Sequence, residues 1–209
     1  MKDTRIQLLK ATINTVVKHG FEDCSMRKVA AAAKLSVSNA YYYFKNKEDM
    51  LIQAYYYVDK EIDSIFSIAS LNIDDLTNNL DGLAKKEFYK FSEFMLKNGT
   101  HSVYFYMFRD NKLFSKAIKN YPNDQLKKLN FTEIADVVQD KIPEIKKVKE
   151  GLVWRYVIEM VGILVKKVLI RGDKPDEQDY ENIYKLTIGG LNNLLGRKEA
   201  VKKPINKFW

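Results

Sequence analysis

The sequence of 209 residues predicts an all-helical protein, and three observations lead to that fold class. Glycine and proline are scarce, at nine and four residues, while residues that favour helices are plentiful. Apolar residues recur at the three- and four-residue spacing of a helix along most of the chain. Hydrophobic residues make up 46% of the chain, enough to bury a sizeable core. We divide the chain into short helices over 1–47, a helical body over 48–196 and a basic tail over 197–209.

The first predicted helix is Thr4–His19, which carries apolar residues on one face and stops before Gly20. Those apolar residues are Ile6, Leu9, Ile13, Val16 and Val17. A glycine directly after the last helical turn is typical of a helix end. Phe21 is expected to fill the core of the amino-terminal helices, and Cys24 is expected to be a small buried side chain rather than a nucleophile.

The next stretch, Ser25 to Lys47, has the pattern of a helix-turn-helix. Two short helices are predicted, Met26–Ala33 and Val37–Tyr43, with a tight turn between them. Ser25 and Ser36 each stand where an N-cap is wanted, because a serine hydroxyl accepts a hydrogen bond from the first amides of a helix. Such short helices are not stable alone, so the preceding helix is expected to pack behind them.

A set of spaced residues in this region matches one known family without a gap. They are Gly20, Phe21, Ser25, Arg27, Ala30, Ala33, Leu35, Ser36, Tyr41, Phe44, Lys47, Glu48 and Leu51. On these positions residues 4–51, about a quarter of the chain, resemble the DNA-binding domain of the TetR/AcrR family of transcriptional regulators. The resemblance implies an amino-terminal helix-turn-helix DNA-binding domain followed by a helical domain for ligand binding and dimerisation.

Candidate DNA-binding residues follow from the motif and the resemblance. They are Ser25, Arg27, Lys28, Ser36, Val37, Ser38, Asn39, Tyr41, Tyr43 and Lys47. The first residues of a recognition helix enter the major groove, where Asn39 can bond adenine and Val37 can contact a thymine methyl. The resemblance implies that the Tyr41 hydroxyl bonds a phosphate. Lys47 begins the following helix, whose amino terminus favours a phosphate.

Two features of the recognition helix, Ala40 and the tyrosine run that follows it, leave alternatives open. Ala40 stands where the family usually has a larger apolar residue, so the packing behind this helix is expected to be slightly reduced. The run Tyr41, Tyr42 and Tyr43 can be divided between phosphate contact and ordinary core packing. We expect one of the three to belong to the core, and partial burial of Tyr42 is one interpretation.

The positive charge of the chain is concentrated at its two ends. Residues 1–50 hold nine basic and five acidic residues, and residues 51–196 hold 21 of each. The tail, 197–209, holds five basic residues and one acidic residue. A basic amino-terminal module on a neutral body is typical of a protein that binds phosphates through that module. For the tail alone, a solubilising role is favoured over DNA contact.

The body is predicted to hold six further helices. They are Lys47–Ala69, Leu76–Lys97, His101–Arg109, Gln125–Lys141, Glu144–Arg171 and Asp176–Leu195. Asn98–Thr100 is expected to separate the second of these helices from the third, with Thr100 as the cap of the third. The last two helices are joined by the short turn Gly172–Pro175 and should pack antiparallel. In TetR-like proteins such a pair forms a four-helix dimer interface, and Gly189 and Gly190 would permit close approach there. The alternative is a monomer that buries the helix pair within one chain.

The sequence gives no indication of catalysis, a metal site or a cofactor. Its only histidines are His19 and His101, and Cys24 is its only cysteine, so no zinc site of ordinary spacing can be formed. It contains no glycine-rich phosphate loop and no hydrolase or metalloprotease motif. His101 is expected at the surface, with ligand contact as the alternative. The single cysteine and the lack of a signal peptide or an apolar span predict a cytoplasmic protein and no membrane.

Aromatic residues in the body are candidates for a ligand pocket between helices. The candidates are Phe88, Phe91, Tyr104, Phe105, Phe108, Trp154 and Tyr156, together with Glu159. For any single aromatic residue, core packing is the favoured interpretation. Glu159 interrupts an apolar stripe, so its carboxylate is expected to point inward. There it would meet a cationic ligand, or pair with Arg155 one turn earlier.

Together these observations predict a TetR-like DNA-binding regulator, and the resemblance implies a homodimer that functions as a repressor, the commonest role in that family. Two recognition helices would enter successive major grooves about 34 Å apart on a palindromic double-stranded operator. A small apolar or aromatic ligand would release the protein from that DNA. The alternatives are a TetR-like protein controlled by a protein partner or acting architecturally, and a small helical enzyme.

Overall fold

We describe the protein from a computed structural model. The structure describes residues 2–65, 80–120, 143–144, 148 and 152–196. Every regular element among these residues is a helix, which confirms the predicted all-helical fold class. The predicted helix Gln125–Lys141 and the basic tail lie outside the described residues.

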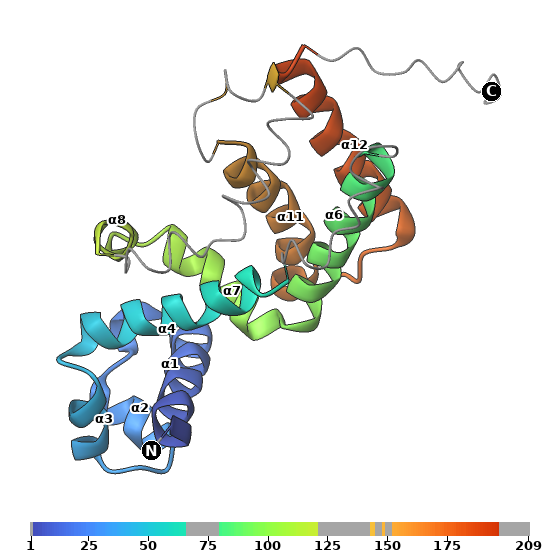
Figure 1. Ribbon diagram of the computed structural model, residues 1–209. Helices are drawn as coiled ribbons and strands as arrows, with labels where there is room; N and C mark the ends of the chain where they lie inside the picture. Colours follow the sequence, from blue (N-terminus) through green and yellow to red (C-terminus); the bar gives the residue numbers. More distant parts are fainter. Residues whose placement is uncertain (1, 66–79, 121–142, 145–147, 149–151, 197–209) are drawn as a thin grey trace. The chain divides into compact units, whose positions relative to one another are not determined.

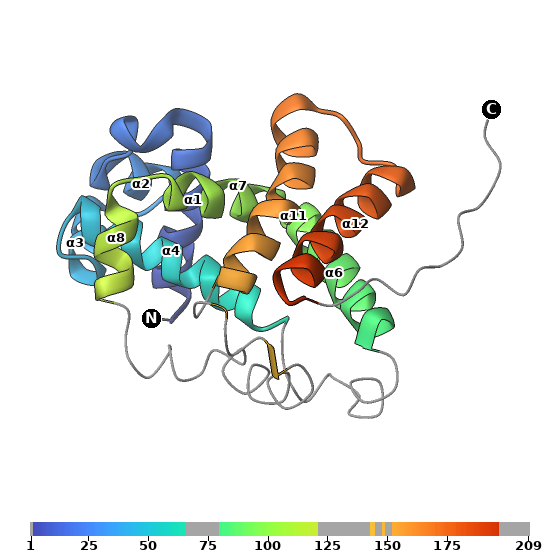
Figure 2. The ribbon, with the colours of Figure 1, turned by 90° about the horizontal axis from the view of Figure 1, so that it is seen from above.

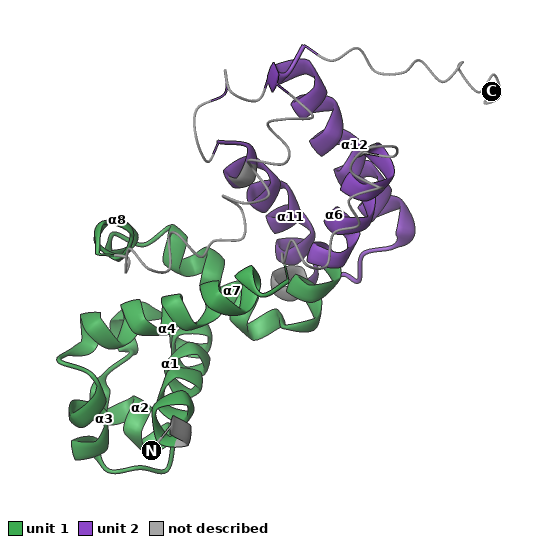
Figure 3. Ribbon diagram, in the orientation of Figure 1, with its two compact units in different colours: residues 1–70, 93–132 green, residues 71–92, 133–209 purple. Residues whose placement is uncertain are grey.

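The chain divides into two compact units, which Figure 3 colours separately. Unit 1 comprises residues 1–70 and 93–132, and unit 2 comprises residues 71–92 and 133–209. The described helices of unit 1 are α1 (Lys2–Asp23), α2 (Met26–Ala32), α3 (Val37–Tyr43), α4 (Lys47–Asp63), α7 (Gly99–Arg109) and α8 (Leu113–Lys119). Those of unit 2 are α11 (Leu152–Arg171) and α12 (Glu177–Leu194). The boundary between the units falls within α6 (Leu80–Lys97).

Helix α1 is the base on which the amino-terminal helices assemble. It packs against α2, α4 and α7, while α3 packs against α2, as can be followed in Figures 1 and 2. The fully buried side chains of this core include Leu8, Leu9, Ile13, Val16, Val29, Ala30, Phe44 and Met50. A hydrogen bond also joins α1 to the end of α2, since Gln7 Nε2 donates to the Ala33 carbonyl at 2.8 Å. The predicted need of the two short helices for a third is therefore met by α1.

Gly20 marks the end of the regular part of α1, as predicted. Its φ of +79° and ψ of 171° are not helical, although a further turn carries the element to Asp23. The residue after it, Phe21, reaches further than expected. Its ring centroid lies 6.1 Å from those of both Tyr104 and Phe108. Phe21 therefore also belongs to the contact between α1 and α7, which the sequence did not predict.

Helix α7 is the aromatic centre of unit 1. Tyr104, Phe105 and Phe108 are all buried. The ring of Tyr55 on α4 stacks on Phe105 and Phe108, at centroid distances of 5.8 and 4.8 Å. The Tyr104 hydroxyl donates to the Leu51 carbonyl at 2.7 Å, so even the polar atom of this buried ring is satisfied by α4. Burial raises the pKa of Tyr104 well above its ordinary value.

Several predicted helix ends are corrected. Helix α4 ends at Asp63, before the predicted Ala69, because the Ser64 hydroxyl and the amides of Ser64 and Ile65 bond the last carbonyls of the helix. Helix α7 begins at Gly99, so Thr100 lies inside it and is not its cap. Glu144 lies in a short 3₁₀ turn with Pro143, and α11 starts at Leu152. Helix α8 was not predicted.

In unit 2, α11 and α12 pack antiparallel, as predicted. Lys167, near the end of α11, bonds Asp179 at the start of α12, with Nζ–Oδ distances of 2.6 and 2.7 Å. Tyr156, near the start of α11, donates to the Leu186 carbonyl further along α12 at 3.1 Å. Gly190 faces the same tyrosine, since an added Cβ would contact the Tyr156 hydroxyl and lie 3.1 Å from its Cζ. The close approach permitted by Gly190 is thus used within the chain.

The turn between α2 and α3 carries a strained residue that leads to a first prediction. Lys34 is exposed and has a φ of +54°, which costs an L-residue about 1–2 kcal/mol. Lys34→Gly relieves this strain, but glycine also raises the conformational entropy of the unfolded chain, so we expect a net stabilisation of about 0.5–1 kcal/mol. Urea unfolding measures this change in the free energy of unfolding. The matched control, Ala31→Gly on the exposed face of α2, should destabilise by about 1 kcal/mol. Destabilisation by Lys34→Gly would contradict the strain.

The thiol of Cys24 leads to a second prediction. Cys24 is fully buried, as predicted, and burial raises its pKa to about 11. Because the thiolate is the reactive form, the native protein should react with an aromatic disulfide reagent at pH 8 at least about 100-fold more slowly than the urea-unfolded chain. Stopped-flow absorbance gives both rates. Similar rates in the two states would show that the thiol is accessible.

Candidate nucleic-acid interface

Helix α3 exposes one face and buries the other. Ala40 is fully buried and Phe44, directly after the helix, is 1% exposed, so the small residue at 40 leaves no exposed gap behind the helix. On the other side Val37, Tyr41 and Tyr42 are 36%, 59% and 69% exposed. Partial burial of Tyr42 is therefore wrong. The half-buried residue of the three tyrosines is Tyr43, whose ring lies 4.9 Å from that of Tyr42.

Ser36 organises the start of α3. It is the N-cap, as predicted, and its Oγ accepts from the Asn39 amide at 3.4 Å and from Asn39 Nδ2 at 2.8 Å. The hydroxyls of Ser36 and Ser38 are 2.8 Å apart and share a hydrogen bond. The polar groups at this end of the helix thus form one local network around the Ser36 hydroxyl. This network holds the Asn39 side chain against its own backbone turn.

Helix α2 presents two basic residues beside α3. Ser25 caps α2, accepting from the Lys28 amide at 3.2 Å, as predicted. Arg27 and Lys28 are exposed, and α2 buries Met26, Val29 and Ala30 on its opposite side. Lys28 lies 3.8 Å from Asp23, a weak ion pair between two highly exposed groups. The sequence pattern of apolar and basic faces therefore matches the observed helix.

The start of α4 carries Lys47 and an Asn cap. Asn46 Oδ1 accepts from the Asp49 amide at 2.9 Å, and Asp49 in turn accepts from the Lys45 amide at 2.8 Å. Lys47 Nζ donates to the Glu22 carbonyl at 3.0 Å, which ties the helix start to the end of α1. An ammonium has three donors, so this bond leaves others for a phosphate. Two acidic residues, Glu48 and Asp49, also occupy this first turn.

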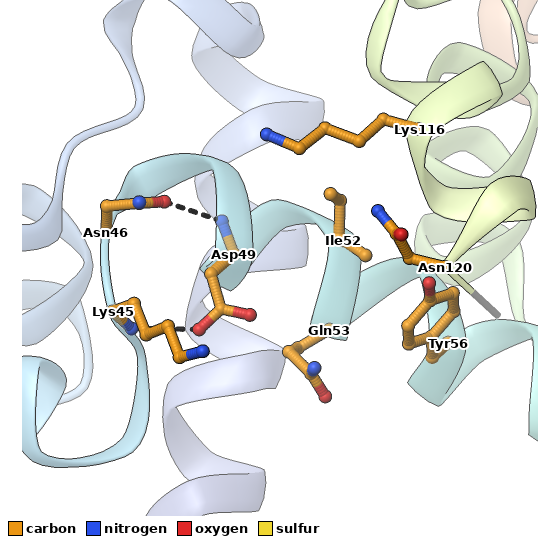
Figure 4. Close-up of a pocket in the computed structure, with 8 residues that line it drawn as sticks. All are labelled: Lys45, Asn46, Asp49, Ile52, Gln53, Tyr56, Lys116 and Asn120. Atoms are coloured by element: carbon orange, nitrogen blue, oxygen red, sulfur yellow. Dashed lines mark hydrogen bonds between the residues drawn. The ribbon is translucent and has the colours of Figure 1, made fainter. Parts of the chain in front are cut away.

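A shallow hollow of about 320 Å³ lies between the first turns of α4 and helix α8. Figure 4 shows the residues that line it: Lys45, Asn46, Asp49, Ile52, Gln53, Tyr56, Lys116 and Asn120. Most of its polar groups already have partners. Tyr56 donates to the Ala117 carbonyl at 2.7 Å, and Gln53 accepts from Arg5 at 2.7 Å. Lys116 pairs with Glu48 and, with its hydrogen bond, lowers the pKa of that carboxyl. These bonds fasten α8 and α1 to α4.

The predicted ligand-pocket residues are divided between the two units. Tyr104, Phe105 and Phe108 pack in the core of unit 1, while Phe88 and Phe91 are buried in unit 2. Tyr156, also in unit 2, is half-buried against α12. The side chain of Trp154 lies outside the described residues. None of these aromatic residues lines the hollow beside α8.

Two polar side chains differ from expectation. Glu159 is exposed, so its carboxylate does not point into the chain's own core as the stripe predicted. Its neighbours in that stripe, Leu152 and Ile163, are themselves 40% and 48% exposed. His101 is half-buried rather than on the surface. Its Nδ1 lies 2.6 Å from Glu61 on α4, which the spacing of 40 residues in the sequence did not reveal.

Comparison with known proteins identifies the amino-terminal domain. Residues 8–54 match the model of bacterial regulatory proteins of the tetR family. No curated protein matches the sequence. Among the described residues, no helix combines the length and the apolar character needed to cross a membrane.

Solved structures extend the likeness to the rest of the chain. A TetR family transcription regulator from Marinobacter aquaeolei VT8 has 19% identity and a TM-score of 0.63, with 89% of this chain and 94% of that chain covered. A TetR-family transcriptional regulator from Haemophilus influenzae RD has 15% identity and a TM-score of 0.61, with coverage of 89% and 94%. The multidrug binding protein EbrR, solved with imidazole, has 15% identity and a TM-score of 0.51, with 90% of each chain covered.

The family match covers most of α1, all of α2 and α3, and the start of α4, so it includes the serine-capped helix α3. The structural matches cover nearly the whole chain at low identity, which is evidence of a shared fold. TetR-family regulators are DNA-binding transcription factors and not enzymes, so the enzyme alternative is set aside. Residues 8–54 thus match the TetR family of bacterial regulatory proteins, and the chain as a whole has the fold seen in TetR-family transcription regulators.

Proposed function

We propose that the protein is a transcriptional repressor that binds a palindromic double-stranded operator as a homodimer. The observation that carries the proposal is the exposed face of α3, in a domain that matches the family. Two adjacent exposed tyrosines and a small, serine-rich helix start are unusual on a surface without a partner. Tyrosine combines a flat apolar ring with a hydroxyl donor, which suits contact with sugar and phosphate.

In this proposal the residues of α3 divide into two roles. Val37, Ser38 and Asn39 stand at the start of the helix, which enters the major groove. Val37 would contact a thymine methyl, and Asn39 would turn its amide from Ser36 to an adenine. The remaining candidates would bind the backbone: Ser25, Arg27, Lys28, Ser36, Tyr41, Tyr43 and Lys47. Arg27 and Lys28 are exposed, which supports this role.

We place the dimer interface on α11 and α12. Each helix buries one face against its own unit and exposes large apolar residues on the other. The exposed residues are Leu152 and Ile163 on α11 and Leu186 and Leu194 on α12. Dimerisation would set the two recognition helices about 34 Å apart, the spacing of successive major grooves. A protein that acts on a bacterial operator would work in the cytoplasm.

The proposed release of DNA by an apolar or aromatic ligand would act through α7. This helix contacts both α1 and α4, and Tyr104 bonds the Leu51 carbonyl of α4. A ligand that shifted α7 would therefore move the base on which α2 and α3 stand. The candidates for its site are Phe88, Phe91, Tyr104, Phe105, Phe108, Trp154 and Tyr156. The structural likeness to a multidrug binding protein solved with imidazole supports this part.

A second candidate function dispenses with the small ligand. The described aromatic residues of α7 pack directly against one another and against Tyr55, which favours a closed body. Such a regulator would answer to a protein partner or act as an architectural DNA-binding protein. Binding to DNA through α3 is common to both candidates, and only the response to small molecules distinguishes them.

The DNA-binding proposal predicts two classes of variant. After selection of a preferred duplex from random sequences, Tyr41→Phe and Lys47→Ala should weaken binding on specific and random DNA alike. Lys47→Ala should also reduce the slope of log affinity against log salt by about 1. Asn39→Ala should cost about 1–3 kcal/mol on the preferred duplex and relax the preference at one base position. Fluorescence anisotropy over a salt series measures all three.

A lysine elsewhere on α4 provides the control for these variants. Lys60 is exposed and lies 13 residues after Lys47, roughly 20 Å along the helix. Lys60→Ala should leave affinity and salt slope nearly unchanged. Equal losses on preferred and random DNA for Asn39→Ala would refute its base-reading role. Failure of the native protein to prefer any duplex would refute the proposal as a whole.

The ligand proposal predicts release of DNA by a small molecule. With the protein held on its preferred duplex, aromatic compounds that include imidazole derivatives and planar cations should be added in turn. At least one should lower the anisotropy to that of free DNA, because it binds the DNA-free state more tightly. The same compound should raise the melting temperature of the free protein. Release by none of them would favour the candidate without a small ligand.

A further inference from the structure

The first turn of α4 carries acidic side chains where the proposed function needs a phosphate. Glu48 and Asp49 directly follow Lys47, the proposed phosphate-binding lysine. The positive end of a helix stabilises acidic residues in its first turn, and it stabilises a bound phosphate for the same reason. A carboxylate and a phosphate at one helix start nevertheless repel each other. A helix start that binds DNA through Lys47 therefore needs the charge of these carboxylates to be compensated.

The two carboxylates are held in different ways. Asp49 is half-buried and accepts from the Lys45 amide at 2.8 Å, within the loop that precedes the helix. Glu48 is exposed, and its partner is Lys116 on α8, 68 positions further along the chain. The Lys116 side chain extends from α8 toward the first turn of α4 (Figure 4). Its hydrogen bond and charge, with a smaller contribution from Lys112, lower the pKa of the Glu48 carboxyl. The charge of Glu48 is thus compensated from α8.

The position of α8, and with it that of Lys116, is fixed by contacts with α4 and α7. Tyr56 on α4 donates to the Ala117 carbonyl of α8 at 2.7 Å. Phe114 of α8 packs edge-on against the Tyr55 ring of α4, with 5.7 Å between the ring centroids. The Tyr55 ring also stacks on α7. Because one ring joins all three helices, a shift of α7 relative to α4 would displace α8 as well and draw Lys116 away from its partner.

We propose that Lys116 is a positioning residue of the DNA-binding site, which holds and neutralises Glu48 so that a phosphate can approach Lys47. This role rests on the proposed function and adds a form of regulation to it. Lys116 acts through Glu48 and does not itself bind the phosphate. When α8 is displaced, the uncompensated carboxylate repels the DNA backbone. The displacement weakens binding on every sequence, because contacts with phosphates carry no sequence information.

Removal of the charge of Lys116 tests this role. Lys116→Met keeps most of the length of the side chain and leaves Glu48 charged. The affinity for preferred and random duplexes should therefore fall about fivefold at low salt, which is roughly twofold for each subunit of a dimer. Adding Glu48→Gln to Lys116→Met should restore the native affinity, because it removes the repelling charge. Lys116→Arg should retain the native affinity, because a guanidinium can keep the ion pair. Fluorescence anisotropy measures all of these affinities.

A second ion pair between helices provides the matched control. Lys85 on α6 pairs with Glu181 on α12 at 2.7 Å, and its side chain is 47% exposed, against 54% for Lys116. Lys85→Met removes the same net charge from the chain and should leave the affinity for DNA unchanged. The substituted side chains of both pairs are exposed or half-buried, so circular dichroism and thermal melting should show folded variants.

Three results would overturn the role of Lys116 and leave the proposed function standing. A native affinity in Lys116→Met would show that Glu48 needs no compensation. A loss that Glu48→Gln does not restore would mean that Lys116 binds phosphate itself or only supports the fold. An equal loss in Lys85→Met would trace the effect to net charge alone. Failure of the native protein to bind DNA is a different result, since it would refute the proposed function itself and this role with it.

Discussion

The aromatic contact that α7 makes with α1 and α4 is the constraint on which the amino-terminal half depends. Helices α2 and α3 have seven residues each and cannot persist alone, so α1 must hold them. Helix α1 in turn is fixed by α7 through Phe21, Tyr104 and Phe108. Each buried aromatic ring of this kind stabilises the fold by roughly 1.5–3 kcal/mol. Since the Tyr104 hydroxyl donates a hydrogen bond to the Leu51 carbonyl of α4, a movement of α7 would displace α4 as well as α1.

The exposed face of α3, which we propose binds DNA, lies on the other side of the helix from its buried residues. Ala40 and Phe44 use the inner side for packing, which leaves the outer side to residues with no structural task. The apolar rings of two tyrosines are exposed to water, which is unfavourable, and burial against a partner surface would remove that cost. At the helix start the Ser36 hydroxyl accepts from the backbone amide and from the side-chain amide of Asn39, so a single residue serves both the fold and the orientation of a candidate base-reading group.

Unit 2 differs from unit 1, because α11 and α12 each have apolar residues both on a buried side and on an exposed side. One side of each helix packs within the unit, where Tyr156 fits against Gly190 and Lys167 bonds Asp179. The other side exposes large apolar residues beside charged ones. Gly190, which was expected to serve a contact between subunits, serves the contact between these two helices of one chain.

The sequence by itself determined the helical class, the helix-turn-helix and its serine caps, since these depend on local spacing and on hydrogen bonds within one turn. It also predicted the antiparallel final pair from the short turn between them. Only the tertiary structure decided which side chains meet across the fold: Phe21 with α7, His101 with Glu61, and Tyr156 with Gly190. It also decided that Glu159 is exposed. The sequence could not decide this, because α11 has apolar residues on two sides and helical periodicity does not tell which side is buried.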